Sequence, residues 1–333
     1  MPRAALVTYD DEVSEAIVET LRNCALGELE FDLFGVTGAD PLPEGGALAA
    51  WCASGCAADL PYLSQTAIRR ADPRAFLPGA RSVVCVAMSY HEDADPPPRA
   101  DCARVARYAR RRDYHDAMRS RLVRLGRRLA TLSPGARWRP AVDTAPLLER
   151  ALAIRAGLGF VGKNTALVHP RLGPELLLGE LVTTAELPRN EPLEIGCGRC
   201  TACLDACPTR ALTAPYRLDA TRCISGWTIE RRGPLPPDAI AGLHGFLFGC
   251  DLCQAVCPIQ RHAAAACNPV LATRPHLQDL PIESLRRLDE PGWRLLAAGT
   301  PLRRLDLSRM HRNLDALAPA PQAKGQGRRS LRA

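Results

Sequence analysis

The chain has 333 residues, of which 47% are hydrophobic and 24% are charged, and its formal net charge is +7. A chain of this size and composition can bury a large core and is expected to fold as a soluble globular protein of about two or three domains. The stretch Met1-Pro-Arg-Ala-Ala-Leu-Val7 lacks the apolar run of a signal peptide or membrane helix, so we expect a cytoplasmic protein without membrane contact.

Basic residues are distributed unevenly along the chain. Between Arg99 and Arg139 there are 13 arginines against three acidic residues, and after Leu302 there are eight basic residues against two acidic ones. Such stretches suit a polyanionic partner. A solvated helix face in an arginine-rich sequence is an equally simple interpretation.

The first part of the chain alternates predicted strands and helices. The apolar run of residues 81–88 predicts a buried strand. Residues 119–132 repeat Leu and Val at helical spacing between arginines, which predicts an amphipathic helix. Residues 147–156 form another helical run that ends at glycines. This alternation predicts an α/β domain over residues 1–190.

The later part of the chain changes character after a stretch rich in Pro and Gly. A small cluster-binding domain is expected over residues 191–262, and a short helical region over 263–317. Residues 318–333 hold hardly any large apolar side chain and are expected to be a disordered tail. The fold class is therefore mixed α/β and α+β. In the helical region, one apolar face is expected from Leu302, Leu305, Met310, Leu314 and Leu317.

Fourteen cysteines in a chain without an export signal favour metal binding or redox chemistry over disulfides. The segment Cys197-Gly-Arg-Cys200-Thr-Ala-Cys203-Leu-Asp-Ala-Cys207-Pro208 has the spacing C-x2-C-x2-C-x3-C-P. Three cysteines two residues apart on a tight loop can reach three irons of one cubane, while the fourth points toward a neighbouring cluster.

A second, shorter cysteine run follows. It reads Cys250-Asp-Leu-Cys253-Gln-Ala-Val-Cys257-Pro258, and Cys223 can supply the missing ligand. Exchange of the fourth cysteines, as in two-cluster ferredoxins, assigns one 4Fe-4S cluster to Cys197, Cys200, Cys203 and Cys257. The other 4Fe-4S cluster is then assigned to Cys207, Cys223, Cys250 and Cys253. Zinc also binds C-x2-C pairs, but it explains neither the third cysteine of the first run nor the repeated Cys-Pro ending.

Eight cysteine ligands leave no iron open to substrate, so two such clusters conduct electrons rather than catalyse. The other six cysteines are given no role, because isolated buried cysteines usually fill space. They are Cys24, Cys52, Cys56, Cys85, Cys102 and Cys267.

The segment Gly157-Leu-Gly-Phe-Val-Gly-Lys-Asn-Thr165 matches G-x-G-x-x-G and nearly matches a P-loop. A dinucleotide fingerprint must follow a strand, whereas a helical run comes first here, and Asn164 stands where a P-loop needs Ser or Thr. We therefore expect no nucleotide at this turn. Lys163 is one of only two lysines among 43 basic residues, which hints that a compact ammonium is needed there. A turn lysine without function is the alternative.

Asp143 lies in Val142-Asp-Thr-Ala-Pro146, just before a predicted helix. The simplest interpretation is a helix N-cap, with Pro146 in the first turn. A carboxylic acid could instead donate a proton there if an apolar cofactor face raised its pKa. Both interpretations remain open from the residues alone.

Several of these motifs occur together and in order. They are the segments 143–150, 157–165 and 178–181, the Cys197 run, and Gly249-Cys-Asp-Leu-Cys253. In this combination the chain resembles epoxyqueuosine reductase from about residue 61 to residue 258. The resemblance implies two-electron removal of the epoxide oxygen from epoxyqueuosine at the wobble position of tRNA. It also implies cobalamin and two 4Fe-4S clusters as cofactors.

The resemblance further implies roles for particular residues. Asp143 matches the general acid of the family, which protonates the departing oxygen. The segment Arg107–His115 matches an aromatic and basic segment beside the cofactor, although Arg111 replaces a glycine that is common there. The cobalamin contacts implied by position are Arg70, Asp143, Leu167, Leu178, Asp251 and Leu252.

The implied partners are tRNA and an electron donor such as a ferredoxin, flavodoxin or flavoprotein, and a monomer is expected. Many members carry a longer helical-repeat region that grips tRNA, whereas residues 263–333 follow the cluster domain here. The basic residues offered there as phosphate contacts are Arg303, Arg304, Arg309 and Arg312. Two alternatives are a reductive dehalogenase-like enzyme that also uses cobalamin, and a non-catalytic two-cluster electron-transfer protein.

Overall fold

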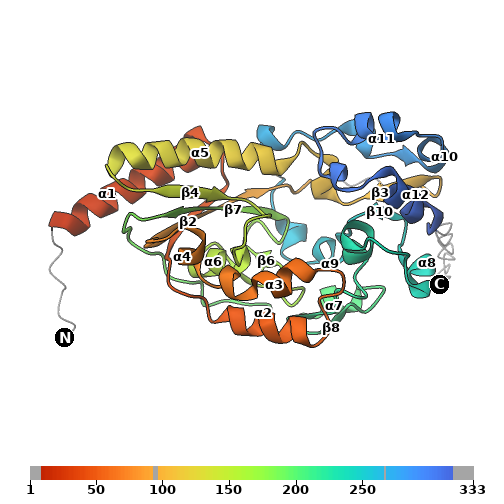
Figure 1. Ribbon diagram of the computed structural model, residues 1–333, viewed down its shortest axis with the longest axis horizontal. Helices are drawn as coiled ribbons and strands as arrows, with labels where there is room; N and C mark the ends of the chain where they lie inside the picture. The colour runs from red at the N-terminus through yellow and green to blue at the C-terminus, as the bar shows by residue number, and fades with distance from the viewer. Residues whose placement is uncertain (1–8, 93–96, 266–267, 318–333) are drawn as a thin grey trace, which may run out of the picture.

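The computed structural model describes residues 9–92, 97–265 and 268–317 (Figure 1). Cys267 and the tail over 318–333, for which disorder was expected, lie outside the described residues. None of the helices formed within these ranges combines the length and apolar composition needed to cross a bilayer.

A four-stranded sheet with the order β1-β2-β7-β4 forms the centre of the first region, and all its pairings are antiparallel. The strands are β1 (Leu33–Gly38), β2 (Ser82–Ser89), β4 (Trp138–Ala141) and β7 (Leu176–Thr183). Every residue of β2 is buried, which confirms the predicted strand over residues 81–88. The alternation of strands and helices did not predict the antiparallel direction, because it carries no information on strand pairing.

Helices cover both faces of this sheet (Figure 1). On one face lie α1 (Tyr9–Asn23) and α5 (Tyr114–Leu132), whose apolar side chains pack against β1 and β2. Helix α5 buries Leu122, Leu125 and Leu129 on a single side, so the predicted amphipathic helix is confirmed, although it begins earlier, at Tyr114. The other face packs against α4 (Pro73–Phe76) and α6 (Glu149–Arg155).

Two further helices, α2 (Glu44–Ala53) and α3 (Pro61–Arg70), pack on each other beyond α4. Helix α6 confirms the helical run expected over residues 147–156 and ends just before Gly157. The glycine-containing segment therefore follows a helix, as expected, and continues into the hairpin of β5 (Phe160–Val161) and β6 (Leu167–Val168).

The two cysteine runs lie on loops that lead into short helices. These are α7 (Ala202–Asp205) and α9 (Leu252–Ala255), which pack on each other. Between them the chain forms a hairpin of β8 (Leu212–Ala214) and β9 (Arg217–Leu218), followed by α8 (Pro237–Gly242). The cysteine-rich loops are thereby brought to one side of the molecule (Figure 1).

A second sheet joins three distant parts of the chain. Strand β3 (Cys102–Val105) pairs in parallel with β10 (Phe246–Phe248) and antiparallel with β11 (Leu280–Pro281). Helices α10 (Ile282–Arg286), α11 (Glu290–Ala297) and α12 (Leu307–Asp315) pack beside it. The expected apolar face is confirmed, because one core cluster contains or contacts Leu302, Leu305, Met310, Leu314 and Leu317.

Candidate functional site

Asp143 lies in the loop between β4 and α6, in a left-handed backbone conformation with φ of 52°. This region is uncommon for residues other than glycine, although aspartate tolerates it better than most. The Asp143 backbone N–H donates to the Glu149 carboxylate, and the N-cap position of α6 is Leu148. The helix N-cap interpretation of Asp143 is therefore wrong, because its carboxylate is directed at another group.

That group is His115, in the first turn of α5. His115 Nε2 lies 3.0 Å from Asp143 Oδ2, and His115 Nδ1 lies 2.7 Å from Asp113 Oδ1. Carboxylates only accept hydrogen bonds, so an imidazole placed between two of them donates from both nitrogens and is an imidazolium. Burial alone would lower the His115 pKa, but these two hydrogen bonds outweigh it and raise the pKa to about 9.

The same contacts act on the Asp143 carboxyl in the opposite sense. Burial would raise its pKa, but the hydrogen bond and charge of His115, with the charges of Arg304 and Arg70, lower the pKa overall. Arg304 lies 3.7 Å from Asp143 Oδ2 and also pairs with Glu230 at 3.0 Å. The pKa of Asp143 is thus lowered by its neighbours in this structure, and the proton between the two groups lies on His115.

Two further carboxyls lie behind Asp143. Burial and then the Asp143 charge raise the Glu149 pKa to about 8. Glu180, on β7, is completely buried, and neither of its carboxyl oxygens has a hydrogen-bond partner. Burial, followed by the charges of Glu149 and Asp143, raises the Glu180 pKa well above its usual value. Both glutamates therefore hold a proton more readily than an exposed glutamate does.

Tyrosine side chains form part of the same environment. The Tyr114 ring stacks on His115 with centroids 4.1 Å apart. Burial raises the pKa of Tyr62, Tyr108 and Tyr114, and the nearby Asp143 charge raises each of them further. Sequence reasoning identified the aromatic segment but missed His115, Glu149 and Glu180 as neighbours of Asp143. The short spacing of Asp113 and His115 was the available signal.

The residues implied as cobalamin contacts occupy three places. Arg70 is buried and donates to the carbonyls of Ala145 and Leu147, so it supports the Asp143 loop. Leu167 on β6 and Leu178 on β7 belong to the apolar cluster between the sheet and α6. Asp251 and Leu252 lie on the second cysteine loop.

This residue set is suited to a large, flat macrocycle with polar substituents. Leu178 and Leu252 are only partly buried and offer apolar surface, whereas Arg70 and Asp251 are buried polar groups. The corrin of cobalamin has such an apolar face and an edge of amide groups. The residues therefore fit the cofactor that the sequence resemblance implies.

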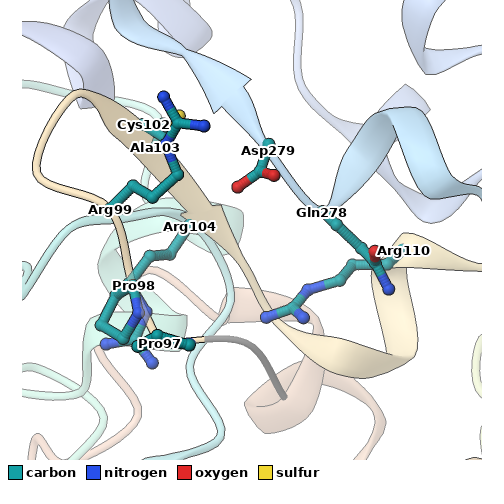
Figure 2. A pocket seen from close by; sticks show the side chains of 9 residues that line it. All are labelled: Pro97, Pro98, Arg99, Cys102, Ala103, Arg104, Arg110, Gln278 and Asp279. Atoms are coloured by element: carbon teal, nitrogen blue, oxygen red, sulfur yellow. The ribbon is translucent and has the colours of Figure 1, made fainter. Parts of the chain in front are cut away.

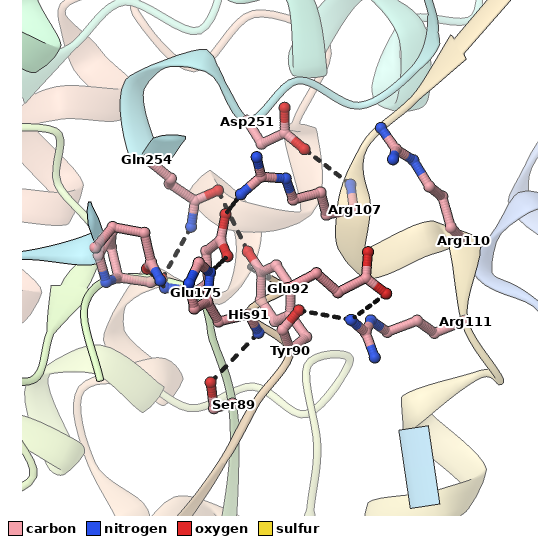
Figure 3. A network of polar contacts seen from close by, with 12 residues as sticks. Ser89, Tyr90, His91, Glu92, Arg107, Arg110, Arg111, Glu175, Asp251 and Gln254 are labelled. Atoms are coloured by element: carbon pink, nitrogen blue, oxygen red, sulfur yellow. Dashed lines mark hydrogen bonds and ion pairs between the residues drawn. The ribbon is translucent and has the colours of Figure 1, made fainter. Parts of the chain in front are cut away.

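A polar network joins the second cysteine loop to the segment that leads to His115 (Figure 3). The Arg107 backbone N–H donates to Asp251 Oδ2 at 2.8 Å, and the Arg107 guanidinium pairs with the buried Glu175 at 2.6 Å. Glu175 also lies 2.8 Å from His91 Nδ1. Gln254, on α9, donates to the Pro174 carbonyl. These contacts connect the cysteine loop with the segment beside the acid.

Arg111 fits this segment without the glycine that is common at its position. Its backbone is extended, with φ of −118°, so the turn does not require glycine. The buried guanidinium pairs with Glu92 at 2.8 Å and donates to the Tyr90 carbonyl (Figure 3). It also donates to the Leu271 carbonyl. Arg111 thus ties the segment to the C-terminal region.

The cysteines of the two runs lie close to one another. Burial raises the pKa of the Cys253 thiol, and the nearby thiols of four other cysteines raise it further. Those four are Cys250, Cys223, Cys207 and Cys203. Burial likewise raises the Cys203 pKa, followed by the effects of Cys197 and Cys200. The structure thus groups seven of the eight predicted ligands, and Cys257 follows at the end of the α9 loop.

Within the described residues, no three His, Cys, Asp or Glu side chains converge on a point that could hold a single ion. Of the cysteines without a predicted role, Cys24, Cys85 and Cys102 are buried, and Cys52 and Cys56 are partly exposed.

A separate small cavity lies beside β3 and β11 (Figure 2). The residues that line it include Arg99, Arg104, Arg110 and Asp279. Its volume of about 30 Å³ suffices for a water molecule or two and not for a corrin. It lies apart from the acid site, since none of the residues around Asp143 lines it.

Comparisons with known proteins agree with this arrangement. Residues 70–144 match the family model described as "Epoxyqueuosine reductase QueG, DUF1730", and residues 196–260 match a "4Fe-4S double cluster binding domain". The first match contains Arg70 and Asp143, and the second contains all eight predicted cluster cysteines. The second match supports two iron-sulfur clusters in this chain.

Relatives with the same name cover most of the chain. The epoxyqueuosine reductase of Synechococcus sp. (strain CC9605) is 41% identical over 83% of this chain and 85% of the relative. That of Escherichia coli (strain K12) is 35% identical over 88% and 79%, respectively.

Solved structures of epoxyqueuosine reductase show the same mixed fold. A selenomethionine-labelled crystal structure matches with a TM-score of 0.81 and 30% identity over 91% of this chain and 80% of that one. A second structure, which contains an epoxyqueuosine-modified stem loop of tRNA-Tyr, matches with a TM-score of 0.80 over the same shares. This chain therefore belongs to the epoxyqueuosine reductase family.

Proposed function

We propose that this chain reduces epoxyqueuosine in tRNA to queuosine: two electrons and two protons break the two epoxide C–O bonds, the oxygen leaves as water and a carbon–carbon double bond remains. The observation that carries the proposal is the connection made by the segment Arg107–His115. One end of this segment is hydrogen-bonded to Asp251 between two cluster cysteines, and the other end is hydrogen-bonded to Asp143. Electron delivery and proton delivery therefore meet at one short piece of chain.

Electrons are supplied by two clusters, which are held by eight cysteines. One 4Fe-4S cluster is held by Cys197, Cys200, Cys203 and Cys257, and the other by Cys207, Cys223, Cys250 and Cys253. Burial raises the pKa of the Cys250 thiol to about 12, so binding of a cluster at this cysteine must release a proton. Residues 191–262 form the cluster domain in this proposal, between a cobalamin-binding domain over 1–190 and a helical region over 263–317.

When bound, cobalamin would supply the reducing power for the opening of the epoxide. Leu167, Leu178 and Leu252 would exclude water from its face, and Arg70 would hold the Asp143 loop beside it through the Ala145 and Leu147 carbonyls. Asp251 keeps the second cysteine loop next to this site through its hydrogen bond to Arg107.

The chain's own residues supply the proton. An alkoxide is a poor leaving group unless it is protonated as the C–O bond breaks. Asp143 is 37% exposed and can meet the substrate oxygen, while His115 Nε2 holds a proton 3.0 Å from Asp143 Oδ2. His115 passes this proton to Asp143, which gives it to the departing oxygen. Asp113 keeps the imidazole oriented throughout.

The tRNA would lie over exposed arginines near this acid. Helix α5 begins beside His115 and carries exposed Arg119, Arg124, Arg127 and Arg128 along its outer side. The C-terminal arginines form more hydrogen bonds and ion pairs within the protein than the sequence suggested. Arg309 and Arg312 donate to backbone carbonyls of residues 227–233. Arg303 pairs with Asp113 but remains about half exposed.

Several properties of the enzyme are part of this proposal. It acts in the cytoplasm as a monomer, and a small redox protein such as a ferredoxin, flavodoxin or flavoprotein reduces its clusters. The splayed anticodon loop would present the wobble base to the acid, as single-stranded loops commonly present bases to proteins.

An assay on tRNA that carries epoxyqueuosine tests the proposal. Anaerobically prepared protein is loaded with clusters and cobalamin, reduced and mixed with this tRNA, and the nucleosides are identified by mass. We expect queuosine, and none when cobalamin is omitted. Fully loaded protein that leaves epoxyqueuosine unchanged contradicts the proposal.

Two measurements separate the alternatives. Binding of an anticodon stem-loop that weakens steeply with salt distinguishes the tRNA enzyme from a reductive dehalogenase. A protein with iron-sulfur absorption that takes up no corrin would be an electron-transfer module.

A further inference from the structure

Lys163 occupies a buried position against the first cysteine loop. It lies in the turn between β5 and β6, where only 9% of its surface is exposed. Its Nζ atom donates to the carbonyls of Gly198 and Cys200, each at 2.8 Å. Gly198 has a φ of 54°, a left-handed conformation that glycine adopts without cost and that turns its carbonyl toward the ammonium.

The same turn contacts cysteines that are predicted ligands of both clusters. The Lys163 backbone N–H points at Cys197 Sγ, 3.4 Å away. The neighbouring Asn164 side chain donates to the Cys253 carbonyl at 3.3 Å. This turn, which resembles a nucleotide-binding motif in sequence, therefore contacts cysteine loops instead of phosphates.

The Lys163 and Asn164 side chains differ in charge. Asn164 is neutral, whereas Lys163 brings an ammonium that, among the described residues, forms no ion pair. A buried charge compensated only by carbonyls keeps much of its field, because little water screens it. A cluster gains negative charge on reduction, so a nearby buried cation and an N–H directed at a cysteine sulfur both favour the reduced form.

We propose that Lys163 is a positioning residue that raises the reduction potential of the cluster held by Cys197, Cys200 and Cys203 relative to the other cluster. The lysine holds the cysteine loop through two carbonyls and places its charge beside three ligands. This inference rests on the cluster assignment in the proposed function.

Lys163→Gln tests the charge, because the amide keeps a hydrogen-bond donor. The holoprotein, with both clusters reconstituted anaerobically, is reduced stepwise at controlled potential and followed by electron paramagnetic resonance. We expect the reduced-to-oxidised ratio of one cluster to fall at least tenfold at a fixed potential, which is about 59 mV for one electron. The reduction potential of the other cluster should change less. A parallel Cys203→Ser protein identifies which signal belongs to the first cluster.

Arg199→Gln is the matched control. Arg199 is on the same loop, next to Cys200, but it is exposed, so solvent and salt screen its charge. We expect a much smaller shift from this variant than from Lys163→Gln. An equal shift would show that any positive charge near the loop acts alike and would overturn the role given to the buried ammonium.

Each of the other possible results also supports or overturns the proposal. Lys163→Gln protein with full iron content and unchanged potentials overturns the proposal. If that variant loses iron, Lys163→Arg restores the charge: recovery of both clusters with wild-type potentials supports the proposal, and failure to recover reduces Lys163 to a structural role. Wild-type protein that cannot take up two clusters contradicts the cluster assignment instead.

Discussion

The cysteine loops and the acid site are built in different ways. The cysteine loops group their ligands by local spacing, since Cys197, Cys200 and Cys203 lie within one short turn and helix α7. The acid site is assembled from distant segments, because Asp143, His115 and Arg304 come from a loop, the start of α5 and the C-terminal region. A substitution in the cysteine loops should therefore have a local effect and abolish function completely. Substitutions in the acid site should lower function by different degrees.

The largest expected effect comes from Cys203→Ser. Loss of this thiolate should remove one cluster and abolish turnover, because the electron path is broken. Iron content and turnover are measured together, with the partly exposed Cys52→Ser as a control that should keep both. Full iron content with normal activity would refute the ligand assignment.

Asp143→Asn tests the chemistry rather than the assembly of the acid site. The amide should keep cluster and cobalamin content but lower turnover by about 10²- to 10⁴-fold, because it cannot deliver a proton. Asp116→Asn is the control, since Asp116 is exposed on α5. An active Asp143→Asn enzyme would show that another acid protonates the oxygen.

His115→Gln should have a smaller effect on turnover, roughly 10- to 100-fold, because Asp143 can then take its proton only from water. It should also change stability with pH. The folded His115 pKa of about 9 lies above its unfolded value of 6.5, so its stabilisation is complete below pH 6.5 and is lost as the pH rises through 9.

The wild type should therefore be more stable than His115→Gln at pH 6, by up to about 3 kcal/mol at 1.36 kcal/mol per pKa unit. This advantage should disappear near pH 10. Urea unfolding at both pH values measures it, and a difference that does not depend on pH would mean that His115 is not protonated in the fold.

The smallest expected effect is a gain in stability from Glu180→Gln. The unfolded glutamate ionises above about pH 4.5, whereas burial keeps the folded one protonated, so Glu180 lowers stability increasingly as the pH rises. The variant should melt a few degrees higher than the wild type at pH 8 and at the same temperature near pH 4.5.

Glu186→Gln is the matched control for this measurement. Glu186 is exposed and pairs with Arg81, so its substitution should change the melting temperature little at either pH. A Glu180→Gln protein that melts lower than the wild type at pH 8 would indicate that the carboxyl has a partner in solution.

The sequence predicted the cysteine region and only part of the acid site. Fixed spacings carry the ligand pattern of a cluster, and helical periodicity identified α5 and α6 because each buries one side. Periodicity carries no information on which loops meet, so the contact of His115 with Asp143 could not be foreseen. The N-cap interpretation failed for the same reason: a distant imidazolium competes with the helix for the carboxylate.

The contact made by Lys163 shows the limit of motif reading in another way. A helix precedes the glycine spacing of residues 157–165, as expected from the sequence. The spacing instead permits a tight turn. A Cβ atom added at Gly162 would lie only 2.5 Å from Asn164 Oδ1. What the turn contacts is determined by the cysteine loops that pack on it.

The pairing of β3 with β10 and β11 has a consequence for biosynthesis. Strand β3 leaves the ribosome early, but its partners lie near residues 247 and 280. This sheet cannot close until most of the described chain has been synthesised, since contacts between distant residues form late. During that interval the edges of β3 are open to pairing with other chains.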